Sequence, residues 1–505
     1  MRAVTLGGPG GLAVEDVEAV ARGGAAVALA DCVLQRVAAS RAALDRAAAG
    51  GQAIYGYNTG LGAKSGTALE GDAAAFQLMF LDGRSIAMGQ PLPRDQVRAA
   101  MLARAAGIAA GGSGLSPSIF ETLVGALNAG VHPVMPGLGS IGAADLGLMA
   151  ALGQALVGRG EAEFGGRVMP AAAALAAAGL APAVLAPKDG LSLISAGSVT
   201  VGQGALVVAE ARRLARRQLE AAALTMEGLG ANLTVLDPRI QAARPAPGQG
   251  EAAAALRALL AGSALHDMPV PLQDPLSIRC IAPIHGAMAS AVAAAAAAVE
   301  LELCSAADNP LVVAEDGFVA STGNFQAPAL ALAFEGLGLA IAQAAAATVA
   351  RFAHLTGPGR NGLPRNLSRR GGASAGFVSL QKTAAALLAA LRHAALPVVL
   401  DIVPVSEGVE DHATQAPLAV AKTATILDLW WRLVALEAMA AAEAVDCRPG
   451  HRLGTGTAAL HGAVRGVVGP LDVDRPLGAE AERLARHLGA GQAAPRPSVS
   501  ASSSA

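Results

Sequence analysis

The sequence predicts a mainly α-helical protein with a long central helical bundle and a small, loop-rich N-terminal region. Long segments rich in Ala, Leu, Arg, Glu and Gln recur along the chain, and Ala and Leu are among the strongest helix formers. Hydrophobic residues make up 53% of the 505 residues, but only 9 Phe, 2 Trp and 2 Tyr are present, so the apolar mass is mostly small and aliphatic. Strand signals are few and short. These features favour closely packed helices.

Seven segments are expected to be helical, and many of them are apolar on most faces, which is typical of helices buried in a bundle or at subunit contacts. They cover residues 96–110, 203–228, 251–262, 284–304, 328–354, 377–395 and 415–445. Connectors rich in Gly and Pro separate them, at 51–66, 132–147, 186–198, 267–279, 356–376 and 401–412. One strand signal, at 311–319, predicts a hairpin that turns around Glu315, Asp316 and Gly317.

The length alone predicts about three domains. However, no linker rich in Pro or Ser and no long run of charge divides residues 15 to 450. We therefore expect an N-terminal region at 1–200, a central helical bundle at 201–450 and a C-terminal helical segment at 451–488. The polar, low-complexity segment 489–505 lacks a core face and is expected to be a disordered tail.

Composition also limits the partners and the compartment. A net charge of −2 argues against nucleic-acid binding. The most apolar runs, 287–299 and 338–350, are rich in Ala and shorter than the ~20 residues that span a bilayer, so no membrane segment is expected. The N-terminus lacks a signal-peptide core, and four scattered cysteines without metal-ligand spacing fit free thiols in the cytoplasm, with no metal site.

Both tyrosines lie in one loop, Tyr55-Gly-Tyr-Asn-Thr-Gly-Leu-Gly62. Its glycines permit tight turns and close approach of the backbone to a ligand. A tyrosine in such a loop can act as a general base. The alternative is a plain turn in which two aromatic rings are packed.

Two further connectors carry charged residues in suggestive positions. Asp145 stands where a helix over 146–157 is expected to begin, so it is either an N-cap worth about 1 kcal/mol or a functional carboxylate. Arg279, at the end of the run QDPLSIR, can bind a carboxylate through two hydrogen bonds or form a surface salt bridge.

Amides and charges concentrate in the later connectors. The segments 308–311 and 322–326 are dense in amides and turn formers. Lys382 lies in the otherwise apolar stretch FVSLQKTAAALLAAL. Burial of a lysine is costly unless it is paired, so we expect a carboxylate partner, and the candidates are Glu407, Glu410 and Asp411.

These motifs together resemble those of the aromatic amino-acid ammonia-lyases. YGYNTGLG, GSIGAADLG, QDPLSIR, ADNPL, TGNFQA and EDH occur in the order and approximate spacing of that family, over roughly residues 10 to 450. Histidine ammonia-lyase is the most similar well-known member. The resemblance implies a mostly helical fold with a long central bundle. It also implies a homotetramer whose active sites combine loops from three subunits.

One segment departs from the family pattern. Typical members carry Ala-Ser-Gly, which cyclises into an electrophilic methylidene-imidazolone (MIO). That reaction needs a serine hydroxyl to lose as water and a glycine nitrogen that attacks the alanine carbonyl. Here the residues are Ala143-Ala144-Asp145, and Ala-Ser-Gly occurs nowhere else. The sequence therefore predicts a protein without MIO or any other cofactor.

Without the electrophile, a free amine is a very poor leaving group, whereas a trimethylammonium group leaves as neutral trimethylamine. The pattern resembles the MIO-free branch of the family, whose known activity is ergothionase. We therefore expect elimination of trimethylamine from a histidine betaine, either ergothioneine to thiourocanate or hercynine to urocanate. The alternatives are an MIO-free lyase for another substrate with a pre-activated leaving group, or a non-catalytic homologue.

The resemblance also implies roles for individual residues. Tyr55 is expected to remove the β-proton and Arg279 to bind the carboxylate of the substrate. Asn309 is expected to orient the substrate, with Phe325 packed near the reacting carbons. Lys382 and Glu410 are expected to hydrogen-bond the ring, which stabilises the charge that develops as the proton leaves.

Further substrate-binding positions are expected where this chain differs from typical histidine ammonia-lyases. Asp145 can offset the positive field of helix N-termini and face the trimethylammonium group. Arg84 replaces a histidine near the substrate ring, and Ser195 replaces an asparagine that helps to position MIO. Leu276 replaces a catalytic tyrosine, which argues against ordinary ammonia elimination.

Overall fold

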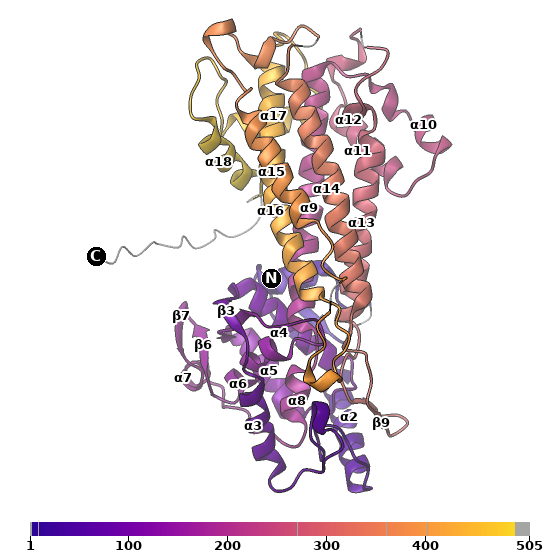
Figure 1. Cartoon of the computed structure of the whole chain (residues 1–505), viewed down its shortest axis with the longest axis vertical. Helices are drawn as coiled ribbons and strands as arrows, with labels where there is room; N and C mark the ends of the chain where they lie inside the picture. Colours follow the sequence, from indigo (N-terminus) through magenta and orange to yellow (C-terminus); the bar gives the residue numbers. More distant parts are fainter. Residues whose placement is uncertain (1–2, 9, 270, 360, 401, 490–505) are drawn as a thin grey trace, which may run out of the picture. The chain divides into compact units, whose positions relative to one another are not determined.

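Figure 1 shows the chain as a computed structural model in which helices predominate. The structure describes residues 3–8, 10–269, 271–359, 361–400 and 402–489. Of the expected tail at 489–505, all residues after Gly489 lie outside the described residues.

The chain folds into two compact units, each assembled from three segments. Unit 1 consists of Met1–Ala209, Ala294–Glu335 and Pro397–Ala421, and unit 2 consists of Glu210–Ala293, Gly336–Leu396 and Lys422–Ala505. The expected N-terminal region at 1–200 lies within unit 1. The expected bundle at 201–450 contributes to both units, because four long helices have residues in each: α9 (Ser198–Leu229), α13 (Ile281–Leu303), α14 (Pro328–Leu355) and α16 (Ala416–Asp446).

Unit 1 combines short helices with small sheets. Strand β1 pairs with β2 in parallel, β3 with β5, β6 with β4 and β7, and β8 with β9, the last four pairings being antiparallel. The elements are β1 (Val4–Leu6), α1 (Val14–Ala21), β2 (Val27–Leu29), α2 (Cys32–Ala49), η1 (Gly62–Lys64), α3 (Ala73–Arg84), β3 (Met88–Pro91), α4 (Arg94–Ala109), α5 (Pro117–Ala129), β4 (His132–Pro133), β5 (Pro136–Leu138), α6 (Leu146–Leu156), β6 (Glu161–Phe164), β7 (Arg167–Pro170), α7 (Ala171–Ala177), α8 (Asp189–Ile194), β8 (Leu311–Val313), β9 (Phe318–Ala320) and η6 (Ser406–Gly408).

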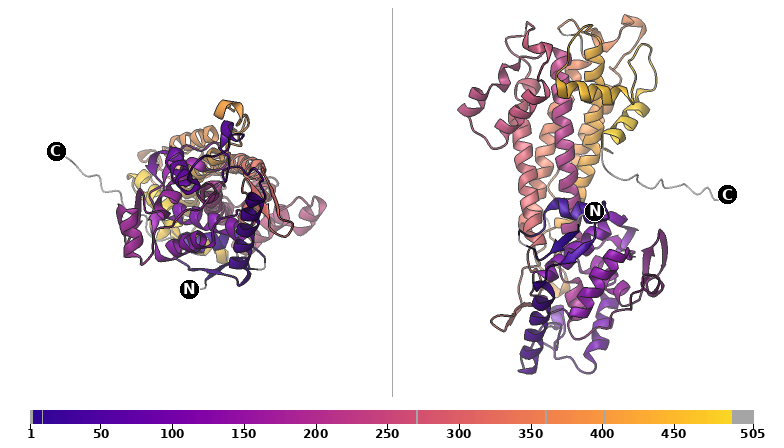
Figure 2. Two further views of the ribbon diagram at one scale, coloured as in Figure 1. Left: turned by 90° about the horizontal axis from the view of Figure 1, so that it is seen from below. Right: turned by 180° about the vertical axis from the view of Figure 1, so that it is seen from behind.

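Unit 2 is built on long helices that run side by side, as the further views in Figure 2 show. Its other elements are η2 (Leu233–Leu236), α10 (Pro238–Ala243), α11 (Gln249–Leu259), η3 (Ala264–His266), α12 (Leu276–Arg279), η4 (Arg365–Leu367), η5 (Gly371–Ala373), α15 (Leu380–Ala394), α17 (Thr455–Arg465) and α18 (Leu477–Gly489). All seven expected helices are present, as α4, α9, α11, α13, α14, α15 and α16. The expected hairpin at 311–319 is also confirmed, as β8 and β9.

Local sequence signals explain several boundaries. Helix α5 starts with Pro117 in its first turn and ends at Gly130, whose φ of 80° is the left-handed conformation that glycine adopts without strain. In α16 the residues from Leu433 to Val445 are all buried, and six of these thirteen residues are Ala. Small side chains let neighbouring helices pack closely, which explains how an alanine-rich chain builds a core.

Three helical segments in the described part of the chain are long and apolar enough to cross a membrane by length and composition alone. They are Asp189–Leu229, Ile281–Leu303 and Pro328–Leu355, with 41, 23 and 28 residues. The expectation that the apolar runs are too short was therefore wrong, because the helices extend beyond them. The most apolar stretch is 89% buried in the first, but 44% and 50% buried in the others. Helices α13 and α14 thus expose apolar side chains in the single chain, including Leu301, Leu332 and Leu339.

Helix α13 also buries an imidazole without partners. His285 is 1% exposed, and neither ring nitrogen has a hydrogen-bond partner among the described residues. Burial, together with the positive charge of Arg351, lowers the pKa of His285 to about 3. Since an unfolded histidine has a pKa of about 6.5, the unfolded state binds more protons between these values. Stability is therefore expected to fall as the pH drops below about 6.5.

We expect His285→Leu to remove this part of the acid sensitivity. The loss of unfolding free energy between pH 7 and pH 5 should be smaller than in the wild type by about 2 kcal/mol, because each pKa unit corresponds to about 1.4 kcal/mol. Urea unfolding at the two pH values measures the difference. His266→Leu is the matched control, because His266 is exposed. Equal pH dependence in wild type and His285→Leu would contradict the prediction.

Candidate active site

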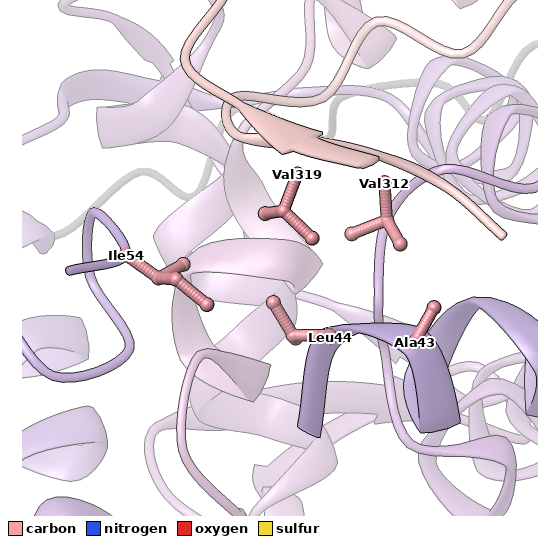
Figure 3. Close-up of a cluster of buried hydrophobic side chains, with 5 residues drawn as sticks. All are labelled: Ala43, Leu44, Ile54, Val312 and Val319. Atoms are coloured by element: carbon pink, nitrogen blue, oxygen red, sulfur yellow. The ribbon is translucent and has the colours of Figure 1, made fainter. Parts of the chain in front are cut away.

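The tyrosine loop of unit 1 is anchored by the residue directly before it, Ile54. Ile54 packs in a buried cluster with Ala43 and Leu44 of α2 and with Val312 and Val319 of the β8–β9 hairpin (Figure 3). This contact fixes the point at which the loop leaves the core. The residue after Ile54 is Tyr55.

The residue after Tyr55 can only be glycine, because its backbone conformation and its close neighbour leave no room for a side chain. Gly56 has a φ of +70°, and a Cβ there would lie 2.5 Å from a methyl carbon of Leu191. The side-chain amide of Gln77 donates a hydrogen bond of 3.0 Å to the Gly56 carbonyl. The loop is therefore held closely against α3 and α8.

The two tyrosines of this loop differ in their hydrogen bonds. The backbone N–H of Gly62 donates to the Tyr55 hydroxyl oxygen at 2.9 Å, and within the described residues the Tyr55 O–H donates to no acceptor. The Tyr57 hydroxyl donates to Asp45 at 3.0 Å, and burial together with this carboxylate raises the pKa of Tyr57. Tyr55 is thus the tyrosine whose hydroxyl is available for chemistry.

Asp145 is fully buried and bonded to the start of α9. Its Oδ1 accepts hydrogen bonds from the hydroxyls of Ser140 (2.7 Å) and Thr200 (3.0 Å), and its Oδ2 accepts from the Thr200 N–H (2.8 Å). Burial raises the pKa of Asp145, although hydrogen bonds from Thr200, Ser140 and the Val199 backbone oppose the rise. Helix α6 begins after Asp145 as expected, but the side chain makes no capping bond to α6. The carboxylate instead caps α9 (Ser198–Leu229).

The residues 143–145 do not fit the MIO group. Ala144, which has a φ of 59°, offers no hydroxyl to eliminate. The nitrogen of Asp145, which stands where ring closure needs an attacking amide, donates its hydrogen to the Ala196 carbonyl at 3.1 Å. Nearby, the Gln415 N–H donates to the Ile141 carbonyl at 2.9 Å.

The two amide-rich connectors are joined to each other. The Thr322 N–H donates to Oδ1 of Asn309 at 3.0 Å, and the Thr322 hydroxyl donates to the Asp308 carbonyl at 3.1 Å. Asp308 is buried and forms an ion pair with Arg104 at 2.6 Å. Asn309 is therefore held in place by its own hydrogen bond to Thr322 and by the ion pair of Asp308 before it.

Phe325 and Glu410 lie on adjoining loops. Gln326, next to the half-buried Phe325, forms a β-bridge with Ala143, and its amide donates to the His412 carbonyl at 3.2 Å. The half-buried Glu410 forms a β-bridge with Val405, the residue directly before η6, and η6 packs against η1. Because η1 starts at Gly62, which bonds to Tyr55, unit 1 brings together the loops that carry Tyr55, Phe325, Glu410 and Asp145.

Arg84 and Ser195 also belong to unit 1. Arg84 is the last residue of α3, and its guanidinium carbon lies 5.3 Å from the centre of the Phe80 ring. Its Nε is buried and has no hydrogen-bond partner among the described residues. Ser195 is buried at the end of α8, directly before the Ala196 carbonyl that binds Asp145.

Arg279 and Lys382 lie in unit 2. Arg279 is half-buried and is the last residue of α12. Lys382 is exposed on α15, and no ion pair among the described residues includes it, so the expected burial and carboxylate partner are wrong for the single chain. The reason is that α15 buries only Leu380, Ala384 and Leu391, whereas most of its other alanines are exposed. The alanine-rich composition was therefore not a sign of burial.

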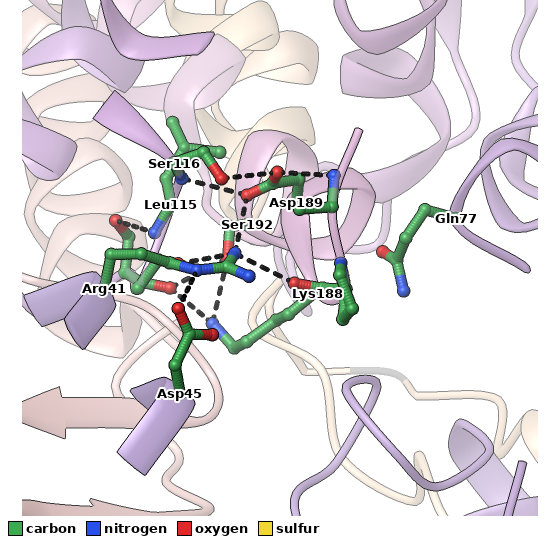
Figure 4. A network of polar contacts seen from close by, with 12 residues as sticks. Arg41, Asp45, Gln77, Leu115, Ser116, Lys188, Asp189 and Ser192 are labelled. Atoms are coloured by element: carbon green, nitrogen blue, oxygen red, sulfur yellow. Dashed lines mark hydrogen bonds and ion pairs between the residues drawn. The ribbon is translucent and has the colours of Figure 1, made fainter. Parts of the chain in front are cut away.

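A buried polar network that the sequence analysis did not identify holds the connector before Ser195 (Figure 4). The Lys188 ammonium donates to Ser192 Oγ at 3.0 Å, and burial lowers the pKa of Lys188 to about 8. Asp189 accepts from the Ser116 hydroxyl at 2.7 Å and from Arg41 at 3.2 Å. The sequence signal for this network was a charged pair, Lys188-Asp189, inside an apolar connector. Among the described residues, no group of three His, Cys, Asp or Glu side chains is placed to hold a metal ion.

This chain is similar to known proteins of one family over nearly its whole length. Residues 12–466 match the family model for aromatic amino acid lyase. The histidine ammonia-lyase of Gloeobacter violaceus is 38% identical over 479 residues, which cover 94% of this chain and 93% of that protein. Among solved structures, the ergothioneine-degrading enzyme ergothionase of Treponema denticola is 30% identical, with a TM-score of 0.93 over 97% of this chain and 99% of that one. Histidine ammonia-lyase of Trypanosoma cruzi is 29% identical, with a TM-score of 0.89 over 97% of this chain and 94% of that one.

Proposed function

The chain belongs to the aromatic amino acid lyase family, a family of carbon–nitrogen lyases, and we propose that it eliminates trimethylamine from a histidine betaine without MIO. The substrate is ergothioneine, which gives thiourocanate, or hercynine, which gives urocanate. The protein needs no cofactor for this reaction.

The observation that carries this proposal is the chemistry of residues 143–145. Ala144 has no hydroxyl, and the Asp145 nitrogen is engaged with the Ala196 carbonyl. Without an electrophile to activate the amine, elimination requires a substrate whose nitrogen already leaves as a neutral molecule. A quaternary trimethylammonium group meets this requirement. The likeness to the Treponema denticola enzyme, which degrades ergothioneine, supports the same substrate class.

Tyr55 is the proposed base. As its oxygen takes the β-proton, the carbon–hydrogen electrons form the new double bond and the carbon–nitrogen electrons leave with trimethylamine. The charge that builds up on the β-carbon spreads into the ring. Lys382 stabilises it by donating a hydrogen bond to the ring, because a donor directed at developing charge lowers the barrier. The Glu410 carboxylate accepts a hydrogen bond from a ring N–H and so orients the ring.

The other residues bind and orient the substrate. Arg279 binds its carboxylate through the planar guanidinium. Asn309 orients it, and Phe325 packs near the reacting carbons. Arg84 and Ser195 lie beside the substrate, next to its ring and to its leaving group.

Asp145 acts by its charge in this proposal. Both of its oxygens already accept hydrogen bonds, so the carboxylate does not need to touch the leaving group. It opposes the positive pole of α9, which would otherwise repel a quaternary cation.

We further propose a cytoplasmic homotetramer whose active sites are shared between subunits. In such an assembly, Arg279 and Lys382 reach the loops of unit 1 from neighbouring subunits, and the exposed apolar faces of α13 and α14 become subunit contacts. Neither nucleic acid nor membrane takes part.

A direct assay tests the function. Purified protein is mixed with ergothioneine, hercynine or histidine, and the near-ultraviolet absorbance of the conjugated acrylate is followed together with release of trimethylamine. We expect turnover of at least one betaine and no ammonia from histidine. Turnover of histidine would favour an ordinary ammonia-lyase, in line with the names of the sequence relatives. Inactivity with both betaines would favour another pre-activated substrate or a non-catalytic homologue.

A further inference from the structure

A buried ion pair in unit 2 touches the short helix that carries Arg279. The guanidinium of Arg351 (α14) and the carboxylate of Glu437 (α16) are both 0% exposed. Nε and Nη2 of Arg351 donate to the two oxygens of Glu437, at 2.5 and 3.0 Å. This two-bond geometry fixes the plane of the guanidinium.

Further donors complete the pair. The amide of Gln218 and the hydroxyl of Thr225, both on α9, donate to the Glu437 carboxylate at 2.9 Å each. The pair thus joins α9, α14 and α16. Since α9, α14 and α16 hold the Glu437 carboxylate in place, and the carboxylate holds two nitrogens of Arg351, these helices also fix the direction of the third nitrogen, Nη1.

That remaining nitrogen is directed at α12. Nη1 of Arg351 donates to the carbonyl of Ser277 at 3.2 Å. Ser277 lies two residues before Arg279 in a helix of only four residues. A helix this short has little stability of its own, so its orientation depends on contacts with the rest of the protein.

The segment before α12 has a second fixed point. Asp274 accepts a hydrogen bond of 2.7 Å from the backbone N–H of Asn232. After α12, Cys280 has φ −97° and ψ 19°, which separates α12 from α13. The segment is therefore attached at Asp274 and at Ser277, and Arg279 lies two residues after the second attachment.

We propose that Arg351 is a positioning residue for Arg279, held in its working orientation by Glu437. The inference rests on the proposed role of Arg279 as the group that binds the substrate carboxylate. Arg351 does not touch substrate in this role. Its hydrogen bond to Ser277 holds the four-residue helix α12 in one orientation relative to the long helices of unit 2. The Arg279 side chain is then already placed to bind the substrate carboxylate, and binding does not have to order α12 first.

Hydrogen–deuterium exchange tests the positioning in the full-length protein without substrate. In Arg351→Lys the single ammonium cannot bind both Glu437 oxygens and the Ser277 carbonyl with the geometry of the guanidinium fork. We expect the amides of Ile278, Arg279 and Cys280 to exchange about tenfold faster, since loss of a hydrogen bond favours local opening. Glu437→Gln, which keeps an acceptor oxygen, should have a smaller effect in the same direction.

Arg465→Lys is the matched control. Arg465 also bonds a buried carboxylate of unit 2, that of Glu443, and within the described part of the chain its other hydrogen bonds go to Asp446 and Val468, which lie outside α12. In the Arg465→Lys protein, the amide hydrogens of residues 278–280 should exchange at the wild-type rate. Unchanged exchange in Arg351→Lys would overturn the proposal whether or not the protein turns over a betaine.

Kinetics provide the second test, in a protein that turns over a betaine. Arg351→Lys should raise KM about tenfold and change kcat less than about twofold, because the lost interaction serves ground-state and transition-state binding alike. In an Arg279→Met background, Arg351→Lys should have no further effect on KM. A fall in kcat alone, or additive effects in the double variant, would overturn the proposal. Absence of turnover in the wild type would refute the proposed function and leave the exchange test to decide this one.

Discussion

Tyr55→Phe is expected to lower kcat for the betaine by about 1000-fold, within the range that a general base contributes. The Tyr55 oxygen is the proposed acceptor of the β-proton, and it accepts a hydrogen bond from the Gly62 N–H, which fixes its position. Phenylalanine keeps the ring but removes the oxygen. Binding of the betaine, measured by calorimetry, should therefore persist while release of trimethylamine stops.

The control for this variant lies two residues away. Tyr57→Phe removes a hydroxyl from the same loop, but that hydroxyl is bonded to Asp45. We expect near wild-type turnover and a loss of about 1 kcal/mol in unfolding free energy, typical of one hydrogen bond. If Tyr55→Phe kept its activity, or if Tyr57→Phe lost as much, Tyr55 would not be the base.

Asp145→Ala is expected to lower the free energy of unfolding by about 3 kcal/mol. The change removes a helix cap, which typically contributes about 1 kcal/mol, and leaves the buried N–H and hydroxyl of Thr200 without acceptors. Asp145→Asn keeps one acceptor oxygen and should lose less. Urea unfolding of the three proteins measures their free energies of unfolding, which should decrease from the wild type to Asp145→Asn and then to Asp145→Ala.

The same pair of variants separates charge from structure. Asp145→Asn removes the negative charge at the start of α9, so KM for the betaine should rise. Binding of imidazole, measured at a pH well above neutral where its ring carries no charge, should not change. A KM equal to that of the wild type in Asp145→Asn would limit Asp145 to a structural role. An Asp145→Ala protein as stable as the wild type would contradict the cap itself.

The helices were predictable because their signal is local. Ala and Leu favour helix wherever they occur, and Gly and Pro end it, so the expected segments agree with α4, α9, α11, α13, α14, α15 and α16. The hairpin at β8 and β9 follows from two short apolar runs on either side of the turn at Glu315, Asp316 and Gly317. The family motifs were equally readable, because each is a short run of adjacent residues.

Burial was less predictable, as Lys382 shows. Its neighbours are apolar, yet α15 buries one narrow stripe and leaves Lys382 exposed in the single chain. Alanine occurs on both faces of a helix, so an alanine-rich stretch does not reveal which face is covered. The partner of a charged residue in such a stretch depends on what packs against it.

The sequence by itself determined the fold class, the family and the absence of a Ser and a Gly from residues 143–145. Each of these depends only on residues that are adjacent or close together in the chain. Only the tertiary structure decided what Asp145 does, since its donors come from Ser140 and from Thr200, 55 residues further on. It also decided that Arg351 and Glu437, 86 residues apart, direct a hydrogen-bond donor at the helix of Arg279. Such contacts form when distant segments pack, and hydrogen bonds between them leave no periodic pattern in the chain.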